Sequence, residues 1–95
     1  MAKTYIEIRD CVRAKVRNFR SIGSEVSDTE VGELTMMELH LTQDSHMPGI
    51  PPADFLAQSI RECVDIYVDL SGDKLVDNPE WTVDKVAKFI FGQIQ

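Results

Sequence analysis

The strongest constraint on the fold is a proline-rich stretch near the middle of the chain. Residues 42–52 hold three of the four prolines and one glycine. Proline lacks a backbone N–H and clashes with the preceding turn of a helix, so neither a continuous helix nor a central strand can pass through this stretch. We therefore expect a surface loop that separates the periodic segments before residue 42 from those after it.

The first periodic segment predicts an amphipathic helix over residues 4–20. Its apolar residues recur at three- and four-residue steps, which is the spacing of one helix face: Tyr5, Ile8, Cys11, Val12, Val16 and Phe19. The opposite face carries four arginines: Arg9, Arg13, Arg17 and Arg20. We expect these arginines to be solvated or to pair with acids elsewhere in the chain.

Turn-forming residues follow this helix and predict a loop over residues 21–33, anchored by Val26 and Val31. The next segment, residues 34–41, is ambiguous. Met37, Leu39 and Leu41 alternate as in a short strand, but one or two helical turns would also bury them.

The second half of the chain predicts a central helix and a terminal helix. A helix begins near Pro52 and continues through a long apolar stripe to a stop at Gly72: Leu56, Ile60, Cys63, Tyr67 and Leu70. Residues 74–79 fit a short helical turn. Thr82 is placed to cap the last helix, and Trp81 precedes it as a hydrophobic staple toward Val86.

Length and composition limit the chain to one domain, residues 1–95, with 43% hydrophobic residues to fill a single core. No long apolar run or secretion signal occurs, so we expect a cytoplasmic protein.

The two cysteines lie in apolar stripes outside any C-x-x-C pair, which predicts reduced core thiols. Two isolated histidines do not predict a metal site.

Charge is divided unevenly along the chain. Residues 1–20 contain six Lys or Arg against two Asp or Glu, whereas residues 21–95 contain four against fourteen. An acidic body repels nucleic acid and anionic membranes and attracts proteins with basic docking faces, most strongly at low salt. We expect a monomer that binds such proteins and neither nucleic acid nor membrane.

Two passages resemble the acyl carrier protein family. Residues 25–34, Glu-Val-Ser-Asp-Thr-Glu-Val-Gly-Glu-Leu, are similar to the family's loop after its first helix. Residues 81–90, Trp-Thr-Val-Asp-Lys-Val-Ala-Lys-Phe-Ile, are similar to its final helix, which opens with Thr-Val. The order of predicted helices also matches the family's four-helix plan. The resemblance therefore implies an all-α bundle, with a long first loop that holds a short strand or turn.

The resemblance also implies a function. The family's Asp-Ser-Leu motif, whose serine carries 4′-phosphopantetheine, is absent, and the one Asp-Ser pair is Asp44-Ser45. Ser45 is therefore the candidate attachment site. The alternative is an unmodified relative that docks on basic partner enzymes of fatty acid or polyketide biosynthesis through the acids of the central helix: Asp54, Glu62, Asp65 and Asp69.

Two other classes of protein remain open. A helical interaction module or assembly subunit of unrelated lineage would bind its partner through Met36, Met37, Phe89 or Phe91, since methionine surfaces adapt to many partners.

An enzyme is the least favoured class, because thiols in apolar stripes stay protonated and inert. Glu38 and His40 alone supply neither a nucleophile nor a metal.

Overall fold

Five α-helices form the protein in the computed structural model, which describes residues 3–41 and 51–94. In chain order they are α1 (Tyr5–Phe19), α2 (Asp28–Glu33), α3 (Pro52–Arg61), α4 (Gly72–Asp77) and α5 (Val83–Ile94). The described residues form no strand, and their only isolated extended pairing is an antiparallel bridge between Thr35 and Thr82. The predicted all-α bundle is confirmed, but the expectation of a loop over residues 21–33 is wrong in part, because α2 lies within that range.

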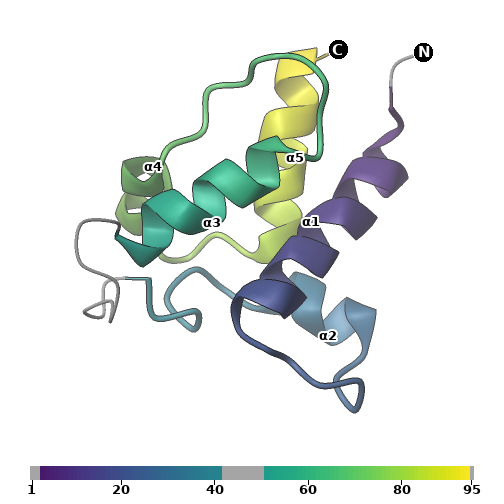
Figure 1. Ribbon diagram of the computed structural model, residues 1–95, viewed down its shortest axis with the longest axis vertical. Helices are drawn as coiled ribbons and strands as arrows, with labels where there is room; N and C mark the ends of the chain where they lie inside the picture. Colours follow the sequence, from purple (N-terminus) through teal and green to yellow (C-terminus); the bar gives the residue numbers. More distant parts are fainter. Residues whose placement is uncertain (1–2, 42–50, 95) are drawn as a thin grey trace.

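Helix α1 begins at a capping box that satisfies two of its free backbone groups. The Thr4 hydroxyl accepts from the Glu7 amide at 3.2 Å, and the Glu7 carboxylate accepts from the Thr4 amide at 3.1 Å. The Thr4 amide and hydroxyl both donate to the Glu7 carboxylate, and these hydrogen bonds lower the pKa of Glu7. The inner face of α1 is fully buried at Ile8, Val12 and Val16, and the helix packs against α2, α3 and α5 (Figure 1).

Helix α5 begins where the sequence predicts it. The Thr82 hydroxyl accepts from the Lys85 amide at 3.1 Å, which satisfies a donor that the first turn leaves free. Trp81, just before the cap, packs its ring on Phe89 at a centroid distance of 5.2 Å. Four apolar side chains of α5 are buried: Val83, Val86, Ala87 and Ile90.

Helix α3 begins at Pro52 as predicted, but the expectation of one helix from there to Gly72 is wrong. The helix ends at Arg61, and residues 62–70 are not helical. The run after it contains Val64, Ile66 and Val68, whose β-branched side chains lose rotamer freedom in a helix. Apolar periodicity alone did not reveal this change of conformation.

Gly72 begins α4 instead of ending the preceding helix. Ser71 caps α4, because its hydroxyl accepts from the Lys74 amide at 3.2 Å. A Cβ at Gly72 would collide with the Asp54 carboxylate and with the backbone of Ala53. Glycine is therefore needed here because the start of α4 lies directly against the first turn of α3.

The two cysteines form a disulfide, so the expectation of reduced thiols is wrong. Cys11 of α1 and Cys63, just after α3, are bonded with their Cα atoms 5.8 Å apart and 52 residues apart in sequence. Their stripes meet because α1 packs against α3, a tertiary contact that sequence spacing does not report. Closing a loop of this length stabilises the fold by about 4 kcal/mol in the chain-entropy model.

The expected pairing of the predicted helix's arginines with acids elsewhere in the chain is confirmed for Arg13 and Arg17, which bind Asp84 and Asp28. Arg13 is 9% exposed and binds the Asp84 carboxylate through two nitrogens, at 2.9 and 2.6 Å. These hydrogen bonds raise the pKa of Arg13. Arg17 donates to the carbonyls of Gly23 and Val26, at 2.7 and 2.8 Å.

The ambiguous segment after α2 forms turns that lie against both α1 and the start of α5. Beyond the bridge at Thr35, residues 36–41 are turns. The Met36 amide donates to the Trp81 carbonyl at 2.8 Å, and Arg20 donates to the Leu39 and His40 carbonyls. Met36, Leu39 and Leu41 are buried as a result.

Replacing Ile60 by alanine should lower the free energy of unfolding by about 2–5 kcal/mol, because its fully buried side chain would leave a cavity. Urea denaturation measures this loss. The matched control is Ile6→Ala, since Ile6 is 56% exposed on α1 and should cost no more than about 0.5 kcal/mol. A loss below about 1 kcal/mol for Ile60→Ala would contradict the assigned core.

Replacing Asp84 by alanine should destabilise the fold by about 2–4 kcal/mol, because the nearly buried Arg13 guanidinium would lose its partner. The control is Asp10→Ala, which breaks an exposed pair with Arg9 and should cost less than about 1 kcal/mol. Thermal unfolding of the two variants compares them directly. Equal losses would mean that the Arg13–Asp84 pair contributes no more than a surface pair.

Candidate functional site

The segment between α3 and α4 gathers acidic and apolar side chains on the surface. We call residues 62–70 the acidic connection, because Glu62, Asp65 and Asp69 are exposed along it. In Figure 1 it passes from the end of α3 across the carboxyl end of α5 and then descends to α4. These three acids had been expected on the central helix and instead lie on this non-helical segment.

Although it is not helical, the acidic connection is fixed at both ends. At its start, Cys63 is buried and bonded to Cys11 of α1. At its end, the Asp69 amide donates to Oε1 of Gln93 in α5 at 2.6 Å, and Nε2 of Gln93 donates to the Asp69 carbonyl at 3.0 Å. Arg61 donates to the Leu70 carbonyl at 2.9 Å. Three apolar side chains of the segment are also buried: Val64, Val68 and Leu70.

Two large apolar side chains between these anchors face the solvent. Ile66 is 57% exposed and Tyr67 is 85% exposed, and the acids Asp65 and Asp69 lie on either side of the pair in sequence. The sequence stripe had placed Tyr67 in the core, which is wrong because the helix ends before it. Single exposed apolar residues are ordinary, and the two adjacent ones here make the segment a candidate contact surface.

The fourth expected docking acid, Asp54, lies elsewhere. It is exposed in the first turn of α3, beside the start of α4, and so lies at the opposite end of α3 from Glu62. Glu62 itself forms an exposed ion pair with Lys15 at 3.2 Å. The structure therefore brings together Glu62, Asp65 and Asp69 on one segment and leaves Asp54 apart from them.

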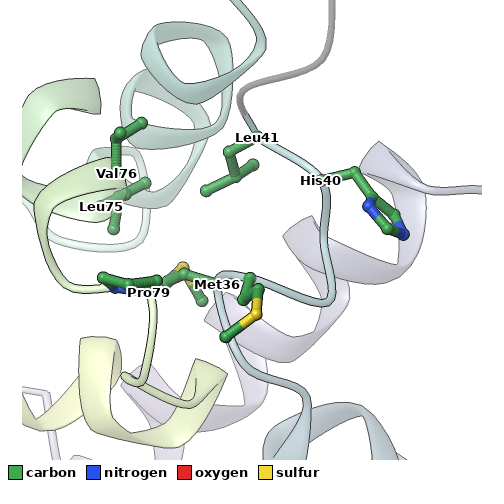
Figure 2. Close-up of a pocket in the computed structure, with 7 residues that line it drawn as sticks. Met36, His40, Leu41, Leu75, Val76 and Pro79 are labelled. Carbon is green, nitrogen blue, oxygen red and sulfur yellow. The ribbon is translucent and has the colours of Figure 1, made fainter.

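A second feature is an apolar hollow of about 220 Å³ between residues 36–41 and α4 (Figure 2). It is lined mainly by apolar side chains: Met36, Met37, His40, Leu41, Leu75, Val76 and Pro79. The His40 ring points away from the hollow in Figure 2. An apolar cavity of about 150 Å³ can hold a benzene molecule, so this hollow has room for a short aliphatic or aromatic group.

The surface expected for the alternative interaction module is only partly present. Met36 is 2% exposed and belongs to the core, whereas Met37 is 66% exposed. Phe89 is partly buried against Trp81, and Phe91 is partly buried against Tyr5 at a ring distance of 5.8 Å. Of the four residues, Met37 is thus the one that stands free on the surface.

Ser45, the candidate attachment site, lies outside the described residues, as does most of the proline-rich stretch. Its nearest described neighbour on the amino-terminal side is Leu41, which lines the apolar hollow. The Glu38 carboxylate accepts from the amide and hydroxyl of Thr35. Within residues 3–41 and 51–94, no cluster of three His, Cys, Asp or Glu side chains could hold a metal ion.

The searches for related proteins give no family assignment. No protein-family model, curated protein or solved structure matches the chain. None of the helices in the described ranges has both the length and the apolar character needed to cross a lipid bilayer.

Proposed function

We propose that this chain is a non-catalytic, acyl-carrier-protein-like docking domain that binds a basic partner protein through the acidic connection. The observation that carries the proposal is the exposure of Ile66 and Tyr67 on a segment fixed at both ends. Asp65 and Asp69 beside them supply charge for a partner of opposite sign.

The apolar pair would supply most of the binding energy. Tyrosine is enriched at the centres of protein interfaces, because its ring buries a large area and its hydroxyl keeps a polar partner. Ile66 adds a second apolar contact beside it. Since Cys63 and Asp69 already hold the segment, binding would cost little loop-ordering entropy, which favours affinity.

The acids would set the choice of partner and the rate of encounter. Residues 21–95 carry fourteen Asp or Glu against four Lys or Arg, so a basic surface is attracted from a distance. Complementary charge raises association rates and disfavours acidic partners. The partner face that fits this chemistry is an apolar notch surrounded by lysine and arginine side chains.

A defined probe tests the docking surface directly. The probe is a synthetic amphipathic helical peptide with leucine and phenylalanine on one face and lysine and arginine at its edges. We expect its addition to shift the amide NMR signals of residues 62–70. Replacing Ile66 and Tyr67 together by serine should weaken binding at least about tenfold, as for a central interface pair.

The matched control for this pair is Ile6→Ser, since Ile6 is 56% exposed and Ile66 is 57% exposed. This control should bind the peptide as the unaltered chain does. Equal binding by the Ile66→Ser/Tyr67→Ser variant and the unaltered chain, or signal shifts confined to other helices, would overturn the docking proposal.

The charge contribution is tested by the double reversal Asp65→Lys/Asp69→Lys. The hydrogen bonds of Asp69 to Gln93 use its backbone, so the substitution leaves them in place. We expect weaker peptide binding and a shallower loss of affinity between low salt and about 0.15 M, where the screening length falls to about 8 Å. The control Glu25→Lys/Glu33→Lys changes net charge equally on another surface, and an identical effect from both variants would exclude local docking by these acids.

Carriage of an acyl group on 4′-phosphopantetheine at Ser45 is the second candidate function. The observation that favours it is the apolar hollow, because its lining residue Leu41 lies four residues before Ser45. Mass spectrometry after incubation with coenzyme A and a phosphopantetheinyl transferase measures the modification, with Ser45→Ala as the control. Under the docking proposal we expect little or no mass increase, since the Asp-Ser-Leu motif is absent. Efficient loading that is lost in Ser45→Ala would make the chain a carrier.

A further inference from the structure

The one covalent crosslink in the described part of the chain lies at the start of the proposed docking surface. Cys63 is the second residue of the acidic connection, and its bond to Cys11 joins that segment to α1. We propose that the Cys11–Cys63 disulfide is a redox switch that keeps the docking surface ordered when oxidised and loosens it when reduced. The inference rests on the proposed docking function, because it assigns a means of regulation to that same surface.

The acidic connection depends on such an anchor because its own backbone gives it little support. Among the described residues, no amide from 65 to 70 donates to a backbone carbonyl, and the Asp69 amide donates to the side chain of Gln93. At the other end, besides the disulfide, the Lys3 ammonium group donates to the Cys63 carbonyl at 2.9 Å, and Glu62 pairs with Lys15 on the surface. The disulfide is the strongest of these contacts at the amino-terminal end of the acidic connection.

The rest of the fold is held by contacts that the disulfide does not touch. Helices α1 and α5 share a buried apolar face and the Arg13–Asp84 pair. Helices α3 and α4 meet at Gly72. Reduction should therefore act first on residues 62–68, while the packing of α1 on α5 persists. This separation is what distinguishes a local switch from global unfolding.

The two cysteines of the disulfide differ in burial and therefore in access to a reductant. Cys63 is fully buried, whereas Cys11 is partly buried at the edge of the core. A thiolate of a dithiol reductant would attack the Cys11 sulfur, break the S–S bond and release Cys63 as a thiolate that takes up a proton. The reductant's second thiol then displaces Cys11 as a thiol. The protein gains two electrons and two protons, and the reductant becomes a disulfide.

Disulfides are rare in reducing compartments and, where they occur, are commonly transient or regulatory. The structure shows the oxidised state, and reduction of the disulfide would give the second state of the switch. In the oxidised state Ile66 and Tyr67 are presented on a fixed segment. In the reduced state the same side chains lie on a segment that must be ordered again before it binds.

The test measures hydrogen exchange by NMR and peptide binding on the same protein, oxidised and after reduction with dithiothreitol. Thiol alkylation and mass spectrometry count the free cysteines in each sample. We expect exchange of the Val64 and Asp69 amides to rise at least about tenfold on reduction, while the Val86 and Ile90 amides of α5 change far less. Binding of the basic amphipathic peptide should weaken about fivefold or more.

The control is Cys11→Ser/Cys63→Ser, which should resemble the reduced protein and give no response to dithiothreitol. If amide hydrogen exchange in residues 62–70 is unchanged after full reduction, the switch is overturned, whether or not the affinity for the peptide changes. Equal acceleration in α5 would also overturn it, because the whole fold would then be opening. Failure of the oxidised protein to bind the peptide, with exchange still redox-dependent, would instead reject the docking function and leave a purely structural switch.

Discussion

The Arg13–Asp84 ion pair is the contact on which the arrangement of helices depends. It joins α1 to the first turn of α5 across 71 residues of sequence, and α2 lies directly over it. A Cβ at Gly32 of α2 would come within 2.5–2.6 Å of both the Asp84 carboxylate and the Arg13 guanidinium. Three helices therefore meet at one ion pair. The attraction between its two charges offsets the free-energy cost of removing each of them from water. The apolar stripes of α1 and α5 supply the larger burial, and the ion pair joins the two helices at one defined point.

Two arginines, one in α1 and one at its C-cap, connect this centre to the less regular half of the molecule. Arg17 and Arg20 donate to backbone carbonyls in the loop before α2 and in the turns after it. Such carbonyls have no helical or sheet partners of their own, so a side chain with several donors can hold an irregular path. A chain with short helices and long connections is thereby held together, and its irregular segments can still present side chains in fixed positions.

Local sequence signals predicted the beginnings of helices better than their ends or their partners. Pro52 and Thr82 act within one turn of the chain, and the structure places helix starts at both. The end of α3 was missed because the apolar stripe continues through Val64, Tyr67 and Leu70 while the backbone leaves the helix. The alternation of buried Val68, exposed Asp69 and buried Leu70 was the signal that could have indicated it. The disulfide and the role of Arg13 depend on tertiary contacts that no local pattern contains.

The contact of α1 with α5 also has a consequence for synthesis of the chain. The first helix leaves the ribosome long before its main partner exists, since Asp84 follows Arg13 by 71 residues. At about 5–20 residues per second, the apolar face of α1 waits roughly 4–14 s for α5. During that interval Ile8, Val12 and Val16 have no native partner on α5 to cover them. The nascent chain is thus most exposed to association with chaperones or with its own copies just before it can fold.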